Sequence, residues 1–434
     1  MTDKKVYRLE QSKTFCMAPW VHIHNLPSGE ILPCCINNQT LKIGNLYEDS
    51  VETIWNNDVY KSIRTDMLAD TPIASCERCY KEEEWGNNQS YRKVFNNEYG
   101  DRYEDLVEQS TTEDGTATKM EFRRWDFRFS NLCNLACTSC GPNCSSMWVE
   151  IVNKMGLPHK GDKFQTSRQN LELFINTIKN QADIVDNIYL AGGEPLIQPE
   201  HYEILKHIDE IGRLDKINFT YSTNLTSLTY KSTNVMDYWN KMKYVKVLVS
   251  LDEVDPDRLY YIRYPSKASE IIDNIKTLNK NFTGNDRRWS ITPTWSIMNI
   301  HRIKDIAAFF KDNSLLPATF ADSAEWEVDL HNILLLYPNH MSISAAPLEW
   351  KQYLRKQLDE YVQWYMDEML SMKNLHVKQR ATDLFLSNIK RFYGALDDNI
   401  QIDPKIHKDW YSRLDRVRNT SFSKAFPELA WNLT

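Results

Sequence analysis

Apolar and polar residues alternate in short runs along the middle of the chain, and segments with helical spacing lie between these runs. Strict alternation over four to eight residues predicts a strand, whereas apolar residues three or four positions apart predict a helix. The predicted strands are Trp125–Phe129, Asn187–Leu190, Lys216–Tyr221, Tyr244–Ser250, Ser290–Ser296 and, approximately, Asn332–Tyr337. The predicted helices between them include Leu171–Lys179, Pro199–Ile211 and Ser269–Leu278. This alternation indicates an α/β fold with a parallel sheet and helical crossovers.

The segments that flank this region have other patterns. Val21–Ile23 and Glu30–Leu32 surround Pro27-Ser-Gly29, which predicts a β-hairpin, and Ser50 is a plausible N-cap of a following helix. Helical spacing returns near the C-terminus over Trp350–Met369, Leu384–Phe392 and Trp410–Val417. We therefore expect a small α+β domain over residues 1–85, a polar linker over 86–120, the α/β region over 121–345 and a helical region over 346–434.

Three cysteines follow the first predicted strand of the α/β region. Cys133, Cys137 and Cys140, here called the triad, have the spacing C-x3-C-x2-C within Phe127-Arg-Phe-Ser-Asn-Leu-Cys-Asn-Leu-Ala-Cys-Thr-Ser-Cys. Iron–sulfur clusters are usually held by four thiolates, so a loop with three leaves one iron open to another ligand. Cysteine triplets also bind zinc, and free cysteines are common in apolar cores.

Glycine and polar residues follow the next predicted strands. Functional residues of α/β barrels lie at the carboxyl ends of strands, although ordinary strand-end capping uses the same residue types. The candidates are Gly192, Gly193, Glu194 and Pro195 after the second strand, Thr223 and Asn224 after the third, Ser250 after the fourth, and Arg263 beyond it. The glycines remove Cβ obstruction, and the carboxylate of Glu194 can pair with an ammonium group.

The triad followed by Leu190-Ala-Gly-Gly-Glu-Pro-Leu resembles the radical S-adenosylmethionine (SAM) enzymes. The resemblance implies a partial (β/α)6 barrel in which the triad holds a [4Fe–4S] cluster whose open iron chelates SAM. In this family the reduced cluster cleaves SAM to a 5′-deoxyadenosyl radical, and flavodoxin or ferredoxin supplies the electron. The resemblance assigns the Gly-Gly-Glu-Pro run to the SAM amino group, Arg263 to its carboxylate, and Thr223, Asn224 and Ser250 to its ribose region.

Two residues of the triad loop need a separate interpretation. Ser139 stands where most relatives have an aromatic residue or methionine, so the usual adenine contact is not expected there. Cys144 follows the triad closely, but a fourth protein ligand would block SAM, so we expect it to be a thiol that binds no iron.

Five more cysteines occur before residue 85, and four of them form a second set. These residues, here called the tetrad, are Cys16, Cys34, Cys76 and Cys79. The C-x12-G-x4-C opening, the Ile-Gly-Asn-Leu block and the final C-x2-C resemble the twitch domain, a shortened relative of the SPASM domain of radical SAM enzymes. Because Trp85 stands where a further cysteine would fall, the resemblance implies one auxiliary [4Fe–4S] cluster. A closed zinc site is the alternative for four cysteines, and Cys35 is expected to be a buried thiol.

Composition narrows the choice of partners. The chain has 434 residues and a formal charge of −7, which disfavours a nucleic-acid partner. It has neither an apolar leader nor an apolar run of about 18 residues, so we expect a cytoplasmic protein without a membrane span. Its nine cysteines, clustered at cofactor-like spacings, favour bound metal over disulfides.

Two classes of function remain. The first is a radical SAM oxidoreductase that abstracts hydrogen from a peptide, a protein or a small molecule, with the auxiliary cluster accepting an electron. The second is a metal-binding structural or sensing protein without SAM turnover. The intact triad, the Gly-Gly-Glu-Pro run and Arg263 favour the enzyme.

Overall fold

The computed structural model describes residues 2–38, 40–157, 159, 162–165, 168–282, 286–315, 330, 333–370 and 375–429. The chain divides into two compact units. The first unit comprises Met1–Ser130, Gln165–Thr220 and Asn240–Tyr244, and the second comprises Asn131–Phe164, Tyr221–Trp239 and Val245–Thr434. Domain boundaries near residues 85, 120 and 345 remain predictions.

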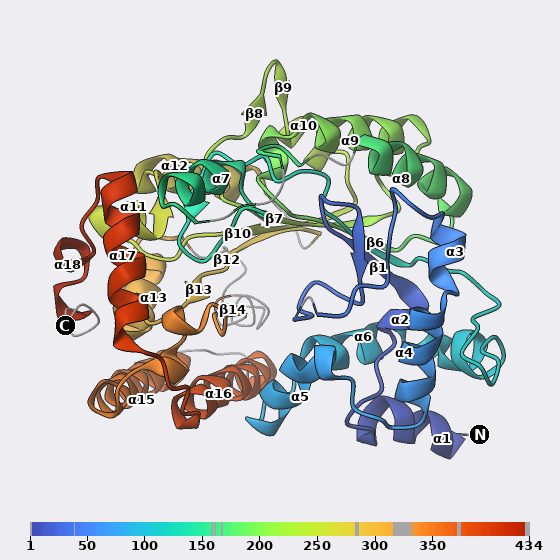
Figure 1. Cartoon of the computed structure of the whole chain (residues 1–434), viewed down its shortest axis with the longest axis horizontal. Helices are drawn as coiled ribbons and strands as arrows, with labels where there is room; N and C mark the ends of the chain where they lie inside the picture. Colours follow the sequence, from blue (N-terminus) through green and yellow to red (C-terminus); the bar gives the residue numbers. More distant parts are fainter. Residues whose placement is uncertain are drawn as a thin grey trace. The chain divides into compact units, whose positions relative to one another are not determined.

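The sheet of the first unit contains both parallel and antiparallel strands (Figure 1). Its neighbouring strands are, in order, β6 (Asn187–Leu190), β4 (Arg124–Phe127), β1 (His22–Asn25), β2 (Glu30–Leu32) and β3 (Gly44–Asn45). The predicted hairpin is confirmed, because β1 and β2 pair antiparallel. Strand β1 also pairs parallel with β4, so that His24 lies opposite Asp126. The N-terminal hairpin therefore extends the sheet that contains the strand preceding the triad.

Helices surround this sheet in the first unit. They are α1 (Thr2–Val6), α2 (Ala18–Val21), α3 (Val51–Trp55), α4 (Asp58–Leu68), α5 (Glu77–Glu84), α6 (Tyr91–Tyr99), α8 (Arg168–Gln181) and α9 (Pro199–Glu210). Ser50 caps α3 as predicted, since its Oγ accepts from Thr53 N at 3.2 Å. The segment 86–120 differs from the polar connector that we expected, because it forms α6 and a π-helix over Tyr103–Glu108. Its residues Phe95, Tyr103 and Leu106 are buried in the core.

The second unit also contains parallel strands. Strand β10 (Tyr244–Val249) pairs parallel with β12 (Arg287–Ile291), and the end of β7 (Asn218–Thr223) lies beside β10. Alternate residues of β10, namely Val245, Val247 and Val249, are fully buried, as the two-residue period of a strand requires. The division between the units falls within β7.

Short two-stranded pairs complete the strands of the second unit. They are β5 (Ala136–Cys137) with β11 (Arg263–Tyr264), β13 (Thr294–Trp295) with β14 (Ile333–Leu334), and β8 (Thr229–Tyr230) with β9 (Thr233–Asn234). The single strand predicted over Ser290–Ser296 is wrong, because β12 and β13 are separate strands. The strand predicted near 332–337 corresponds to β14, and Asn332 lies outside the described residues.

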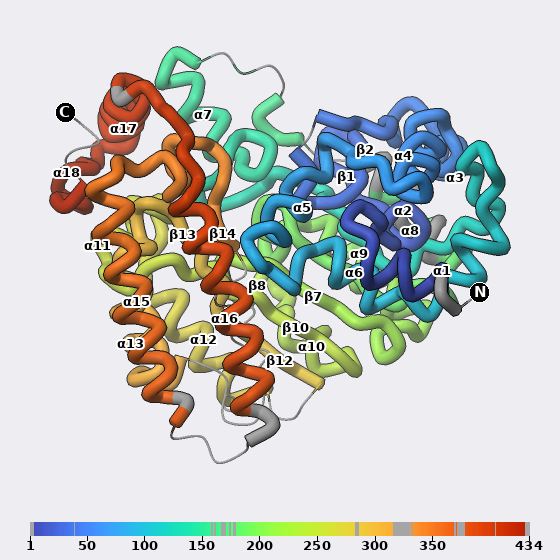
Figure 2. Tube along the Cα trace, turned by 90° about the horizontal axis from the view of Figure 1, so that it is seen from below, coloured from blue at the N-terminus to red at the C-terminus, as the bar shows by residue number. Residues whose placement is uncertain are grey.

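The four helices predicted in the second unit are present and longer than expected: α12 (Ala268–Asn281), α15 (Leu348–Leu370), α16 (Leu375–Asp397) and α17 (Pro404–Arg418). The unit also contains α7 (Ser146–Lys154), α10 (Met236–Trp239), α11 (Pro256–Ile262), α13 (Ile303–Asp312) and α18 (Phe422–Ala425). Helices α15 and α16 run side by side (Figure 2). The rings of Tyr365 and Phe385 stack between them. No helix in the described ranges is long and apolar enough to cross a membrane. The predicted α/β class with parallel strands is confirmed.

Candidate metal centres

The tetrad lines a single cavity of the first unit. Its members come from three parts of the chain: Cys16 precedes α2, Cys34 follows β2, and Cys76 and Cys79 lie at the start of α5. Residues three apart on a helix face the same side, which explains how the C-x2-C pair contributes two thiols to one cavity. The structure thus brings together all four cysteines that the sequence grouped. Across the described ranges, no three His, Cys, Asp or Glu side chains lie close enough together to hold a single metal ion.

Apolar and aromatic side chains form much of the remaining cavity wall, including Met67, Tyr91 and Phe95. Arg92 also lines the cavity, and its guanidinium donates to Phe15 O at 2.7 Å and pairs with Glu83. This wall keeps water from the thiols and leaves them in a medium of low polarity.

Burial dominates the protonation of the tetrad. It raises the pKa of Cys16 to about 12 and the pKa values of Cys34, Cys76 and Cys79 above the usual thiol range. Metal binding requires thiolates, so an occupant of this cavity must bring positive charge that offsets the burial. Four buried thiols around one largely apolar cavity fit the donor set of a cysteine-held iron–sulfur cluster.

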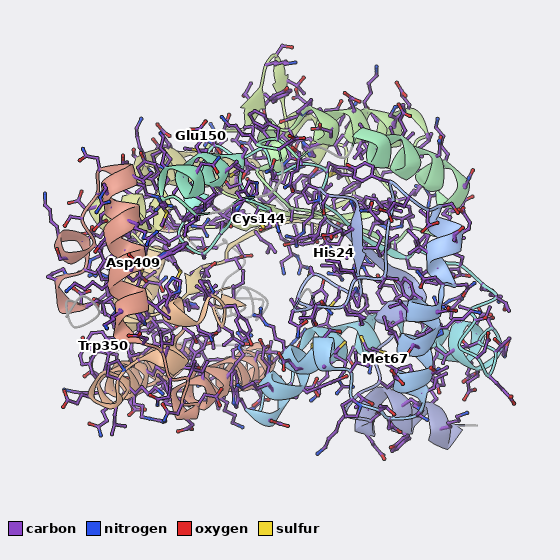
Figure 3. The ribbon with its side chains drawn as sticks, in the orientation of Figure 1. His24, Met67, Cys144, Glu150, Trp350 and Asp409 are labelled. Atoms are coloured by element: carbon purple, nitrogen blue, oxygen red, sulfur yellow. The ribbon has the colours of Figure 1, made fainter. Side chains whose placement is uncertain are left out.

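The triad occupies a loop of the second unit. Cys137 lies in β5 opposite Arg263 in β11, and Cys140 N donates to Cys137 O at 3.0 Å. Cys137 is buried, Cys133 is partly buried and Cys140 is exposed. Cys144, labelled in Figure 3, comes just before α7, whose N-cap Ser145 accepts from Met147 N at 3.2 Å. Helix α7 therefore begins directly after Cys144 and its cap.

Several N–H groups point at the sulfur atoms of the triad. Cys133 Sγ lies 3.4 Å from Leu135 N and 3.9 Å from Asn224 Nδ2. Cys137 Sγ lies 3.6 Å from Arg263 Nη1. A hydrogen bond from Cys140, together with the charge of Arg263, lowers the pKa of Cys137 to about 7 in spite of burial. Hydrogen-bond donors of this kind stabilise thiolates. The triad loop can therefore hold a metal cluster because its own surroundings favour ionised sulfur, whereas the tetrad depends on the positive charge of its occupant.

Arg263 has a second partner that the sequence did not reveal. Its Nε lies 2.7 Å from Asp252 Oδ2 and its Nη2 lies 2.9 Å from Asp252 Oδ1, a bidentate pair. Asp252 is fully buried and also accepts from Thr294 N at 2.7 Å. The Asp252 carboxylate raises the pKa of Arg263 although burial lowers it, so Arg263 stays charged beside Cys137. The signal in the sequence was Asp252 itself, which stands two residues after Ser250 at a strand end.

The other predicted SAM contacts lie at two strand ends. Asn224 donates to Asn134 Oδ1 at 3.0 Å within the triad loop, so the second unit brings Asn224 and the triad together. Thr223 Oγ1 accepts from Leu225 N at 2.9 Å, and Ser250 N donates to Thr223 O at 2.8 Å. The Thr223 hydroxyl thus caps the end of β7, whereas the bond of Ser250 is a backbone bond between β7 and β10.

The Gly-Gly-Glu-Pro run belongs to the first unit and follows β6. Gly192 has a φ of +121°, and a Cβ there would lie 3.3 Å from both Arg128 Cβ and Ser130 O, so the position favours glycine. Gly193 N donates to Ser130 O at 3.0 Å. The buried carboxylate of Glu194 accepts from Leu196 N at 3.1 Å and caps the short helix Pro195–Ile197. This turn is fixed against the segment that leads into the triad loop.

A buried charged cluster in the first unit was missed by sequence reasoning. His24 Nδ1 lies 3.0 Å from Asp126 Oδ2, and Arg128 Nε lies 3.5 Å from Asp126 Oδ1 (His24 is labelled in Figure 3). Although burial opposes it, the charges of His24 and Arg128 keep the pKa of Asp126 below its usual range. Burial lowers the pKa of neighbouring His22 to about 3. Only the parallel register of β1 and β4 brings His24 and Asp126 together, and nothing local in the sequence predicts that register.

Comparison with known proteins agrees with both cysteine sets. Residues 127–310 match the radical SAM superfamily, and residues 16–80 match the SPASM iron–sulfur cluster-binding domain. The chain thus contains a radical SAM domain, and a SPASM domain precedes it in the sequence. The radical SAM domain indicates an enzyme that uses SAM and a [4Fe–4S] cluster, and the SPASM domain suggests a further iron–sulfur cluster.

Three crystal structures of SuiB from Streptococcus suis are similar to the chain at 15% sequence identity. The structure bound to S-adenosylmethionine covers 54% of this chain with a TM-score of 0.32, and the structure bound to the precursor peptide SuiA covers 59% with a TM-score of 0.33. A third SuiB structure covers 67% with a TM-score of 0.31. The matched part spans 43%, 54% and 58% of the respective SuiB chains. No curated protein matches the chain.

Proposed function

We propose that this protein is a radical SAM oxidoreductase of the maturase type that holds two [4Fe–4S] clusters, one at the triad and one at the tetrad. The radical SAM core is proposed to be a partial (β/α)6 barrel. The observation that carries the proposal is the pair of cysteine sets. One set lines a largely apolar cavity with four thiols, and in the other set the sulfur atoms of Cys133 and Cys137 face N–H donors.

The number of protein ligands assigns the two roles. A cluster held by three thiolates keeps one iron open, whereas a cluster held by four is closed to further ligands. SAM bound at the open iron would supply, on reduction, a 5′-deoxyadenosyl radical that abstracts hydrogen from a C–H bond. The electron donor would be a flavodoxin or a ferredoxin.

The chain's own residues would orient and enclose these groups. Cys133, Cys137 and Cys140 would hold the SAM cluster, with Leu135 N, Asn224 and Arg263 supporting the thiolates through the contacts described above. Gly192, Gly193, Glu194 and Pro195 would meet the SAM amino group. Thr223, Asn224 and Ser250 would meet its ribose region. Arg263 would meet its carboxylate with the guanidinium edge that Asp252 does not occupy.

The tetrad is proposed to serve as an electron acceptor. A closed cluster cannot bind substrate through iron, so its chemistry is limited to exchanging electrons. Loss of a hydrogen atom from the substrate followed by loss of an electron is a net two-electron oxidation. The resemblance to twitch and SPASM enzymes favours a peptide or protein as substrate, with a sugar-like small molecule as the second candidate.

Reductive cleavage of SAM tests this function. Anaerobically reconstituted protein is incubated with SAM and dithionite, and 5′-deoxyadenosine is measured by liquid chromatography. We expect 5′-deoxyadenosine from the wild type and none from a variant that lacks the triad. Transfer of deuterium from a labelled candidate into 5′-deoxyadenosine then identifies the substrate. A fully reconstituted, folded wild type that forms no 5′-deoxyadenosine would instead support a structural or sensing role.

A further inference from the structure

A buried arginine of the C-terminal helix reaches the triad loop. Arg418 is the last residue of α17 and only 4% of its surface is exposed. Its Nη2 donates to Ala136 O at 2.5 Å, and its Nη1 donates to Tyr261 O at 3.3 Å. Ala136 precedes Cys137 in β5, and Tyr261 lies in α11, two residues before Arg263. The guanidinium of Arg418 therefore bonds to both segments, β5 with Cys137 and the end of α11 next to Arg263.

Aromatic rings cover the same guanidinium. Its Cζ lies 4.8 Å from the ring centroid of Trp148 and 5.1 Å from that of Tyr264. Trp148 Nε1 in turn donates to Cys137 O at 2.7 Å. The backbone carbonyls of Ala136 and Cys137 are thus held by Arg418 and by a ring that Arg418 packs against. Arginine suits this position because its planar group can donate and stack at once.

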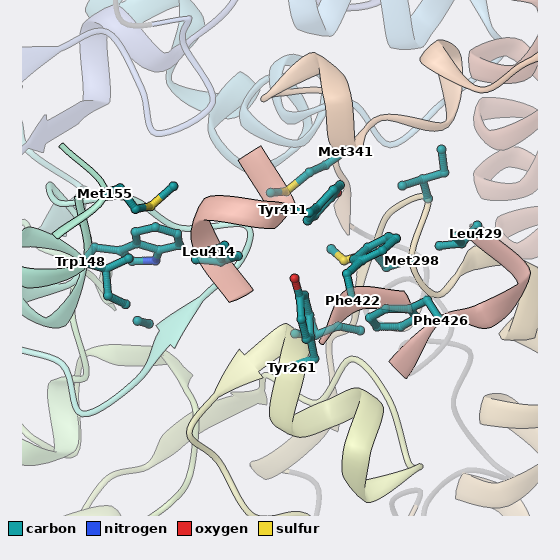
Figure 4. Packing of buried hydrophobic residues seen from close by; sticks show 14 of the residues in the cluster. Trp148, Met155, Tyr261, Met298, Met341, Tyr411, Leu414, Phe422, Phe426 and Leu429 are labelled. Atoms are coloured by element: carbon teal, nitrogen blue, oxygen red, sulfur yellow. The ribbon is translucent and has the colours of Figure 1, made fainter. Parts of the chain in front are cut away.

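The C-terminal segment holds Arg418 in place. Tyr411, Phe422 and Phe426 pack with Trp148 and Tyr261 in one apolar cluster (Figure 4). Asn419 ends α17 in the left-handed conformation, with a φ of 52°, directly after Arg418. The rotational freedom of Arg418 is small, since its side chain is buried and contacts the buried ring of Trp148.

No carboxylate pairs with Arg418 among the residues that the structure describes. Its hydrogen bonds go to carbonyl groups, and its Nε is buried without a partner. Burial lowers the pKa of Arg418 to about 10, which leaves it charged at neutral pH. A buried charge is costly, and the negative charges that act on Arg418 from nearby include those of Cys137 and Asp415. The triad thiolates bring such charge, and Arg418 acts on Cys137 electrostatically.

We propose that Arg418 is a positioning residue of the triad loop, which fixes the backbone around Cys137 and raises the reduction potential of the cluster held there. The proposal rests on the function proposed above. Reduction adds negative charge to a cluster, and a fixed positive charge nearby favours the reduced form. Helix α17 would therefore belong to the SAM-cleaving site in addition to covering the second unit.

The test compares three variants of the full chain: Arg418→Met, Arg418→Lys and the control Arg413→Met. Arg413 lies on the same helix and pairs with Asp409 at the surface. Iron content and circular dichroism first establish that each variant is folded and loaded. Potentiometric titration followed by electron paramagnetic resonance (EPR) then gives the potential of the cluster whose signal changes when SAM is added.

The proposal predicts a shift to more negative potential in Arg418→Met, confined to the SAM-responsive signal. Arg418→Lys should show a smaller shift, because lysine keeps the charge but cannot donate to the two carbonyl groups with the planar geometry of arginine. Arg413→Met should match the wild type. A folded, fully loaded Arg418→Met with unchanged potential overturns the proposal. Where Arg418→Met loses its fold or its iron, an unchanged potential and line shape in Arg418→Lys overturn it instead. A wild type without any SAM-responsive signal would remove the proposed function and not only the role of Arg418.

Discussion

The two cysteine sets are built by opposite means. The tetrad gathers four thiols from three separated segments around a cavity, and burial raises the pKa of every one of them. The triad takes three thiols from one loop, where a hydrogen bond from Cys140 together with the charge of Arg263 lowers the pKa of Cys137, while the pKa of Cys140 is raised. The tetrad therefore depends on tertiary folding to bring its thiols together, whereas the triad loop favours the thiolate form at Cys137.

This difference matches the proposed division of labour. A closed site needs shielding and rigid ligands, which a cavity lined by Met67, Tyr91 and Phe95 provides. A site that receives SAM needs one accessible face, and Cys140 is the exposed member of the triad. If the two sets act independently, removal of one should leave the function of the other intact, and the largest effect is expected at the triad.

Removal of the triad should abolish SAM chemistry. Replacement of Cys133, Cys137 and Cys140 by Ala is expected to eliminate 5′-deoxyadenosine completely and to lower the iron content from about eight to about four per chain. Chromatography and iron analysis measure the two effects. Residual 5′-deoxyadenosine at the parental rate would show that the triad is not the SAM-cluster site.

Removal of half the tetrad should separate the two activities. The double variant Cys76→Ala/Cys79→Ala is expected to cleave SAM reductively but not to convert the true substrate. Its iron content should again be about four per chain. Losing a cluster can unfold a small domain, so circular dichroism and gel filtration must first match the parent. Parental turnover of substrate by a folded variant would contradict the electron-accepting role and favour a structural cluster.

Breaking the buried pair beside Cys137 should cost stability. Arg263→Gln leaves the fully buried Asp252 without its guanidinium, and removing one partner of a buried pair costs about 3–5 kcal/mol. Urea denaturation of Arg263→Gln and of the double variant with Asp252→Asn measures this coupling. If Arg263→Gln is as stable as the parent, the ion pair of Arg263 with Asp252 does not stabilise the triad loop.

Loss of the Glu194 carboxylate should weaken SAM binding alone. A hydrogen bond to a charged group is worth about 1.5–3 kcal/mol, so Glu194→Ala is expected to lower SAM affinity roughly 10- to 100-fold with iron unchanged. Isothermal titration calorimetry under anaerobic conditions gives the affinity. Undiminished binding would mean that Glu194 only caps the helix Pro195–Ile197, as its bond to Leu196 N permits.

The smallest effects are expected at the two cysteines outside both sets. Cys35→Ser and Cys144→Ser should retain the full iron content and the parental yield of 5′-deoxyadenosine. Cys35 is only partly buried, so the expectation of a buried thiol is not met. Burial raises its pKa to about 11, as burial also raises the pKa of the tetrad thiol Cys16, so the pKa alone does not separate Cys35 from a metal ligand. Iron analysis decides the question, and a loss of about four irons in either variant would move that cysteine into a ligand set.

The sequence predicted the parts of this molecule that depend on local spacing. Strand β6 was predicted with its correct bounds, and the cap at Ser50 follows from a side chain that bonds within one helical turn. The grouping of the tetrad also followed from spacing, because a hairpin and a C-x2-C pair constrain where thiols can lie.

Contacts between distant segments could not be predicted from the sequence. The parallel pairing of β1 with β4 joins residues about a hundred positions apart, and no local pattern specifies that register. The bidentate bond of Asp252 to Arg263 and the reach of Arg418 to Ala136 depend on how helices α11 and α17 pack. Segment 86–120 was predicted as a connector because its apolar residues are few, yet those few are buried.

The central claim is that one chain holds two clusters, one open to SAM and one closed. The most direct measurement is EPR of the dithionite-reduced, reconstituted protein before and after SAM is added, with iron and zinc analysed on the same sample. We expect two signals, of which SAM alters only one, and about eight irons per chain. A single signal with about four irons and one zinc per chain would contradict the claim and identify the tetrad as a zinc site.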